Sequence, residues 1–184
     1  MVDLIRAAAA LQARLDQLAL PNCVIGGLAV QAWGEVRTTR DADFTVLTRF
    51  VDEEEKAREI FRLITPRRPD ALPFGLQNRV LLGYMEGDIA VDLGMGGFEF
   101  EESVVARAVS VELAPSVWLR VCSAEDLVIM KTFAGRDRDW DDIRGVIERQ
   151  AELDWGYIES GLPELLELAE APERMDRLLR MRSE

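Results

Sequence analysis

The candidate functional residues of this sequence are three aspartates and a pair of glycines, because their types and spacing suit a catalytic or metal-binding site. Gly26 and Gly27 follow a short apolar run, and Asp41 and Asp43 come after thirteen further residues. Asp92 lies on a later apolar segment. Alternation along an extended strand puts Asp41 and Asp43 on one face, about 7 Å apart. Carboxylate oxygens at that spacing suit hard divalent cations.

These residue types favour phosphoryl-transfer chemistry. Mg²⁺ binds few protein carboxylates and completes its octahedron with water and substrate phosphates. Two such ions, about 3.5–4 Å apart, can clamp the attacking and leaving oxygens of an in-line displacement. Glycine backbone at a helix N-terminus can approach a triphosphate closely and donate N–H bonds to it. We therefore expect two Mg²⁺ ions and a nucleoside triphosphate at this site.

The amino-acid composition argues against several other classes of protein. The chain contains no histidine, which excludes Ser-His-Asp and Cys-His nucleophiles and His-ligated zinc. Its two cysteines lie far apart in the sequence, so no disulfide framework is predicted. With 34 acidic and 22 basic side chains the net charge is -12, which argues against extended DNA binding. Charges interrupt the longest apolar stretches, so we expect no membrane segment, and the absence of a disulfide framework favours a cytoplasmic protein.

Hydrophobic periodicity predicts helices and strands in a mixed order. Ser123 is expected to cap one helix and Gly135 to end it. The segment 65–73, which contains three prolines, is predicted to be a loop. The predicted helices are 3–19, 28–34 after a turn at Gly26-Gly27, 52–63, 98–108, 123–134, 136–150 and 154–182. The predicted strands are 23–25, 41–47, 78–85, 88–95, 109–113 and 117–123, with a hairpin turn at Glu86-Gly87.

This order predicts an α/β (α+β) fold with a mixed β-sheet flanked by helices. Residues 1–122 would form the core. Residues 123–184 would form a helical C-terminal segment that closes one side of the cleft.

Two stretches of the sequence resemble a known enzyme superfamily. The segment GGLAVQAWGEVRTTRDADF resembles the G-G/S and R-x-T-x-D-x-D signature of polymerase-β-like nucleotidyltransferases, and DIAVDL resembles the strand that bears their third carboxylate. The segment SAEDLVIMKTFAGRDRDWDDI resembles AbiEii-type toxin nucleotidyltransferases of toxin–antitoxin systems and related minimal nucleotidyltransferases. The resemblance covers about residues 22–147 and implies a nucleotidyltransferase fold.

The resemblance also implies an activity and a site. The activity is transfer of a nucleoside monophosphate from an NTP such as ATP, with Mg²⁺, to a hydroxyl acceptor, releasing pyrophosphate. Asp41 and Asp43 would hold the metal, and Asp92 would be a third ligand that helps to deprotonate the acceptor. The matched nucleotide-binding positions are Gly26, Gly27, Arg37, Thr39 and Lys131.

Some assignments stay open at the level of the sequence. Asp88 shares the strand face of Asp92 and is an alternative third carboxylate, although its place beside the turn favours Asp92. The arginines outside the motif have two interpretations: they are solvated surface charge, or they surround the aspartates and grip an acceptor phosphate. This set comprises Arg67, Arg68, Arg136 and Arg138.

The acceptor and the biological role also stay open. One acceptor class is a tRNA end or a protein, as for a toxin with a cognate antitoxin. The other is a small hydroxylated molecule, as in antibiotic-modifying relatives. The alternative from a different class is a catalytically inactive nucleotidyltransferase-like module that binds a nucleotide or a partner protein.

Overall fold

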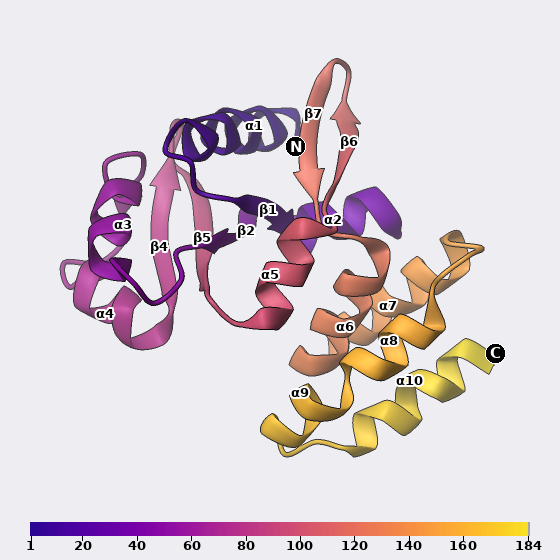
Figure 1. The fold of residues 1–184 in the computed structure, drawn as a ribbon. Helices are drawn as coiled ribbons and strands as arrows, with labels where there is room; N and C mark the ends of the chain where they lie inside the picture. The colour runs from indigo at the N-terminus through magenta and orange to yellow at the C-terminus, as the bar shows by residue number, and fades with distance from the viewer. Residues whose placement is uncertain (184) are drawn as a thin grey trace. The chain divides into compact units, whose positions relative to one another are not determined.

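The computed structural model of this chain describes residues 1–183, which form two compact units. The first unit combines Met1–Leu28 with Thr38–Cys122. The second combines Ala29–Arg37 with the residues from Ser123 onward. The predicted boundary keeps 29–37 with the N-terminal part, whereas their contacts group them with the C-terminal helices. Figure 1 labels most elements of both units.

A mixed sheet of seven strands forms the centre of the first unit, in the order β3-β4-β5-β2-β1-β7-β6. The pairs β2–β5 and β1–β7 are parallel, and the other neighbouring strands are antiparallel. The strands are β1 (Asn22–Ile25), β2 (Asp41–Leu47), β3 (Thr65–Pro66), β4 (Val80–Met85), β5 (Ile89–Gly96), β6 (Val109–Ala114) and β7 (Val117–Val121). The predicted mixed α/β fold is confirmed.

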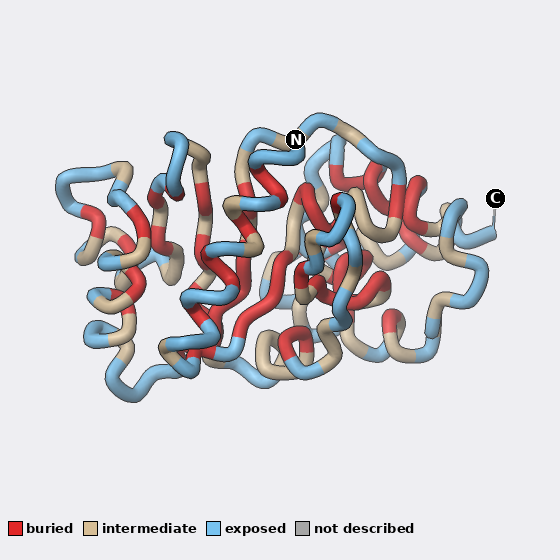
Figure 2. Tube along the Cα trace, turned by 90° about the horizontal axis from the view of Figure 1, so that it is seen from above, coloured by how far each residue is buried: buried red, intermediate tan, exposed pale blue. Residues whose placement is uncertain are grey.

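Strands β2, β4 and β5 present two different faces. Buried residues, red in Figure 2, run along the strands. One face carries the apolar core, formed here by Ala42, Phe44, Leu81, Val91 and Leu93. The opposite face is only half-buried and carries Asp41, Asp43, Leu82, Ala90 and Asp92. The period-2 alternation of these strands therefore separates a core face from a face that solvent can reach.

Helices pack around this sheet. Figure 1 shows α3 and α4 beside β4, and α1 packs on β1 and β7 through an apolar stripe at helical spacing. These helices are α1 (Val2–Gln17), α3 (Glu53–Ile60), α4 (Ala71–Asn78) and α5 (Glu99–Ala106), while α2 (Gly26–Trp33) begins in the first unit and passes into the second at residue 29.

The segment 65–73 differs from its prediction as a loop. Thr65 and Pro66 form β3 against β4, and α4 begins at Ala71. Pro73 lies in the first turn of α4, where the backbone N–H has no partner within the helix. Proline therefore costs no helical hydrogen bond at this position, and the prolines did not exclude a helix.

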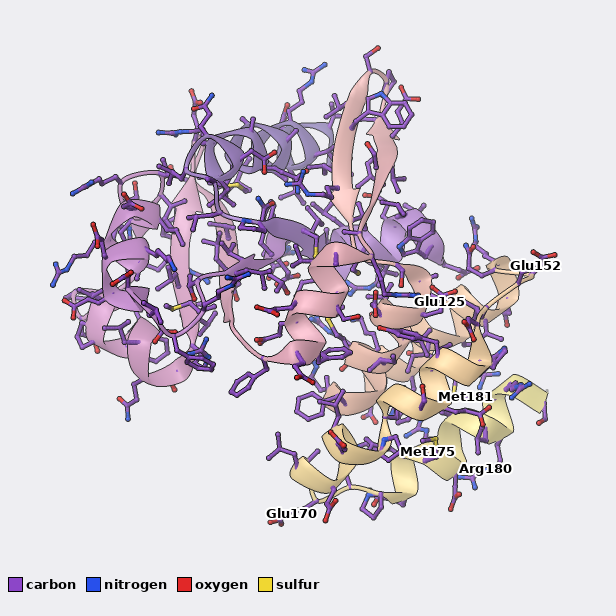
Figure 3. All side chains as sticks on the ribbon, viewed as in Figure 1. Glu125, Glu152, Glu170, Met175, Arg180 and Met181 are labelled. Carbon is purple, nitrogen blue, oxygen red and sulfur yellow. The ribbon has the colours of Figure 1, made fainter. Side chains whose placement is uncertain are left out.

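The second unit is helical, as predicted. Its elements are α6 (Ala124–Ala134), α7 (Asp137–Arg149), α8 (Trp155–Gly161), α9 (Pro163–Leu168) and α10 (Glu173–Ser183). Figure 3 labels Met175, Arg180 and Met181 along α10. Ser123 caps α6, because its Oγ accepts from the Asp126 N–H at 3.1 Å, and Gly135 ends that helix in the left-handed region. Both predicted signals for this helix are confirmed.

The segment after α2 packs on α7 within the second unit. Gln150 Nε2 donates to the Trp33 carbonyl at 2.7 Å, and a Cβ at Gly34 would lie 3.1 Å from the Val146 side chain. These contacts explain why 29–37 belong to the C-terminal unit. Among residues 1–183, none of the helices combines the length and the apolar character that spanning a bilayer requires.

Candidate active site

The three predicted carboxylates lie on two neighbouring parallel strands. Asp43 on β2 is the register partner of Asp92 on β5, and Asp41 is the partner of Ala90. Register partners on adjacent strands share a face and lie about 4.8 Å apart. Asp88 lies outside this ladder, in the turn before β5, with a φ of 57°. The structure therefore brings Asp41, Asp43 and Asp92 together and leaves Asp88 at the turn.

The glycine pair faces the same strand from β1. Ile25 is the register partner of Asp43, so the chain leaves β1 beside the aspartates. Gly26 has a φ of 59°, and a Cβ at this position would lie 2.0 Å from Asp43 Oδ2. The Gly27 N–H donates to the same Oδ2 at 3.3 Å. Glycine at position 26 is thus needed to let the backbone approach the Asp43 carboxylate at the start of α2.

Thr39 connects the second glycine to the first aspartate. A Cβ at Gly27 would lie 2.4 Å from Thr39 Oγ1. The Thr39 hydroxyl donates to Asp41 Oδ1 at 3.0 Å and lies 3.3 Å from the Asp41 carbonyl oxygen. In this structure the hydroxyl orients the Asp41 carboxylate, a role that the spacing alone did not reveal.

Asp92 is paired with an arginine that the motif does not contain. Arg67 Nη2 donates to Asp92 Oδ1. Burial raises the pKa of Asp92, and the negative charge of Asp41 acts in the same direction, against the lowering effect of Arg67. The sequence alone allowed two interpretations of Arg67, as a surface charge or as a residue of the site. No periodic signal could place it, because the adjacent strand β3 has only two residues.

Lys131 and Arg37 lie in the second unit and have carboxylate partners there. The Lys131 side chain is 7% exposed, and its Nζ lies 2.8 Å from Asp139 and 2.7 Å from Asp142. Arg37 holds both oxygens of Asp142, through Nε at 2.7 Å and Nη2 at 3.1 Å. Asp139 also pairs with Arg136 at 2.7 Å. The two predicted nucleotide-binding cations thus belong to one ion network around the buried carboxylates of Asp139 and Asp142.

This ion network lowers the pKa of Asp139. Burial alone would raise the pKa of Asp139, but hydrogen bonds from Arg136 and Lys131 and their positive charges outweigh it and lower that pKa. Asp139 therefore stays ionised while it neutralises the buried ammonium group.

The carboxylates of β2 and β5 have the chemistry that Mg²⁺ requires. Among residues 1–183, no three acidic, cysteine or histidine side chains converge in the geometry of a preformed metal site. Each of the three aspartates is held by a protein partner: Asp41 by Thr39, Asp43 by Gly27 and Asp92 by Arg67. Mg²⁺ commonly binds through one or two carboxylates plus substrate phosphates, so a preformed cage is not needed. The donor set fits a metal that arrives with nucleotide.

Two solved structures share this fold, and a third aligns with a lower TM-score. The solution structure of the antibiotic-resistance factor ANT(2'')-Ia aligns with a TM-score of 0.50 and 16% identity, over 99% of this chain and 90% of that one. An antigenic nucleotidyltransferase-like protein from Paracoccidioides brasiliensis aligns with a TM-score of 0.51 and 12% identity, over 95% and 91%. A crystal structure of ANT(2'')-Ia with adenylyl-2''-tobramycin aligns with a TM-score of 0.44 and 17% identity, over 94% and 93%.

The first two likenesses show the nucleotidyltransferase fold alone, because identity is low. No curated protein matches the sequence significantly. Residues 1–179 match the family described as nucleotidyltransferase of unknown function (DUF6036). Because this match spans nearly the whole sequence, the chain belongs to that family of nucleotidyltransferases.

Proposed function

We propose that this protein transfers a nucleoside monophosphate from an NTP to a hydroxyl group, with Mg²⁺. The observation that carries the proposal is the register of Asp43 with Asp92, which puts both carboxylates, with Asp41, on a half-buried sheet face beside Gly26. Membership of a nucleotidyltransferase family supports the same chemistry. The family match does not extend to AbiEii-type toxins, so that assignment stays a prediction.

The aspartates have separate tasks in this proposal. Asp41 and Asp43 would bind the metal, which when present would neutralise charge on the phosphates. Asp92 would be the third metal ligand and would also accept the proton of the acceptor hydroxyl at a carboxylate oxygen, because the chain contains no histidine to act as base. The acceptor oxygen then forms a bond to the α-phosphorus, and the bond from that phosphorus to the bridging oxygen of pyrophosphate breaks.

The start of α2 has a second task. Its first backbone N–H groups carry the positive end of the helix dipole and lie beside Asp43. Glycine at both positions leaves this backbone without side-chain cover. We propose that the phosphates of the nucleotide lie against Gly26 and Gly27, with Thr39 as a further nucleotide-binding residue of the same unit. The nucleotide-binding roles of Arg37 and Lys131, which belong to the second unit, stay predictions from the resemblance.

An assay with α-labelled NTPs tests this function directly. Purified protein, Mg²⁺ and cell extract are expected to give a labelled acceptor and free pyrophosphate. The double variant Asp41→Asn/Asp43→Asn is expected to abolish both products, since it removes two metal ligands. Asp88→Asn is the matched control, because Asp88 lies outside the ladder and asparagine tolerates its positive φ. Equal labelling by the double variant would refute the proposal.

The same assay separates the open alternatives. Label on tRNA or protein supports a toxin-like role with a cognate antitoxin, and label on a small hydroxylated molecule supports a modifying enzyme. Nucleotide binding that survives Asp92→Asn without any pyrophosphate release would instead identify an inactive binding module.

A further inference from the structure

Arg67 reaches the third carboxylate from the edge of the sheet. It directly follows β3, and its backbone N–H donates to the Leu82 carbonyl at 3.1 Å, which extends the β3–β4 pairing by one residue. Leu82 is the register partner of Asp92. Arg67, Leu82 and Asp92 therefore lie in one row across the sheet, and the row continues to Asp43. The sheet itself places this guanidinium at the candidate site.

The contact between Arg67 and Asp92 uses only part of the guanidinium. Nη2 donates to Asp92 Oδ1, with the Val91 carbonyl at 3.5 Å, while the buried Nε has no hydrogen-bond partner among residues 1–183. Arg37 shows the complete form of such a pair in this chain, since its Nε and Nη2 hold both oxygens of Asp142. Paired forks of this kind are the stronger and more specific geometry. Arg67 instead contacts Asp92 through one nitrogen, which is the weaker geometry.

Solvent reaches both partners of this contact. The Asp92 side chain is 35% exposed and that of Arg67 is 24% exposed. A divalent cation that binds Asp92 must approach the carboxylate that Arg67 already holds, and two cations at one carboxylate repel each other. Metal binding at Asp92 and the ion pair with Arg67 are thus competing states of one side chain.

We propose that Arg67 is an exchangeable counterion of the third carboxylate. It holds Asp92 until Mg²⁺ and nucleotide arrive together. With Mg²⁺ and nucleotide bound, Asp92 would be a metal ligand, and the Arg67 guanidinium, released from Asp92, would bind a phosphate oxygen of the nucleotide through its unpartnered Nε. This inference rests on the proposed function, because it needs a nucleotide and a metal at this face. Arg67 therefore weakens binding of Mg²⁺ alone and strengthens binding of the nucleotide complex.

Two binding measurements on the full chain test this exchange. Calorimetric titration with Mg²⁺ alone is expected to give Arg67→Met a roughly fivefold lower Kd than wild type, since the competing charge is gone. Titration with a non-hydrolysable ATP analogue at saturating Mg²⁺ is expected to give the same variant a roughly fivefold higher Kd. Opposite shifts cannot come from general damage to the fold, which would weaken both. Arg67→Lys, which keeps the charge, is expected to restore both values toward wild type.

Arg68 supplies the matched control. It pairs with Asp70 through two nitrogens and stacks on Phe74, so its acidic partner is not a carboxylate of the candidate site. Arg68→Met is expected to leave both Kd values unchanged. An unchanged or higher Kd of Arg67→Met for Mg²⁺ alone, or an unchanged Kd for the nucleotide, would overturn the exchange.

A third variant separates this inference from the function beneath it. Asp41→Asn/Asp43→Asn is expected to lose Mg²⁺ binding. If it binds Mg²⁺ as wild type does, the proposed function fails. If it loses Mg²⁺ while Arg67→Met behaves as wild type, only the role of Arg67 fails.

Discussion

Gly26 lies so close to the Asp43 carboxylate that a side chain at position 26 would collide with it. A Cβ on Gly26 would be 2.0 Å from Oδ2 and 2.5 Å from the carboxyl carbon of Asp43. Real Cβ atoms do not approach other atoms so closely, so glycine is required by the carboxylate as well as by the positive φ of 59°. The glycine turn and the aspartate strand are therefore one structural unit, although thirteen residues separate Gly27 from Asp41.

Gly26→Ala is expected to damage both the fold and the site. The left-handed backbone alone should cost about 1–2 kcal/mol of unfolding free energy. The new methyl group must also displace the Asp43 carboxylate, so Mg²⁺ affinity and nucleotidyl transfer should fall well beyond what this loss of stability explains. Urea unfolding and Mg²⁺ calorimetry measure the two effects separately.

Gly87→Ala provides the control for this prediction. Gly87 also has a positive φ, 78°, but a Cβ there would meet only Ile89 Cδ1, at 4.0 Å. This variant should lose a similar free energy of unfolding and keep its Mg²⁺ affinity. Equal Mg²⁺ affinities for the two variants would show that the crowding at Asp43 has no functional consequence.

Thr39→Val is expected to weaken metal binding more than nucleotide binding. Valine keeps the shape of threonine but removes the hydroxyl that donates to Asp41 Oδ1. A hydrogen bond of this kind contributes about 1 kcal/mol, so the Kd for Mg²⁺ should rise roughly fivefold. Thr39→Ser keeps the donor and should behave as wild type. A raised KM for the NTP with an unchanged Mg²⁺ Kd would instead favour direct contact with the nucleotide.

Lys131→Met is expected to destabilise the second unit strongly. The variant leaves Asp139 and Asp142 buried without the ammonium group that lies between them. Removing one partner of a buried pair costs about 3–5 kcal/mol. Arg136→Met removes an exposed partner of the same Asp139 and should cost about 1 kcal/mol or less.

Chemical unfolding of these two variants measures the difference between them. Similar losses would contradict the burial argument. A nucleotide Kd that stays at the wild-type value in folded Lys131→Met would contradict the nucleotide-binding role that the resemblance implies for this lysine.

The sequence predicted the aspartate face of the sheet because that face depends on local alternation. Strand β2 has the predicted bounds, and its apolar residues alternate with Asp41 and Asp43 as expected. The hairpin that carries Asp92 was also predicted from its turn and its two apolar runs. Period-2 patterns of this length determine which face each side chain occupies.

The ion-pair partners of the site residues could not be predicted from local sequence patterns. Arg67 is placed by β3, a strand of two residues whose only support is pairing with β4. Lys131 is buried because Asp139 and Asp142 contact it from the next helix, which the periodicity of its own helix does not show. Asp139 also accepts the Arg136 N–H at the start of α7. Contacts between segments that are far apart in the sequence determine these ion pairs and the burial of Lys131.

Acid is expected to weaken the second unit through Asp139. Hydrogen bonds and positive charges lower the pKa of this carboxyl in the folded state against the effect of burial. A lowered folded pKa means that ionised Asp139 stabilises the fold above its unfolded pKa, near 3.9, and that this stabilisation disappears as the pH falls through the folded value. The unfolding free energy should therefore decline below about pH 4. Asp139→Asn should be less stable at pH 7 and should show a flatter acid decline, since asparagine does not titrate. Urea denaturation from pH 3 to 7 on both proteins gives the two slopes, and parallel slopes would show that Asp139 does not contribute to the acid dependence.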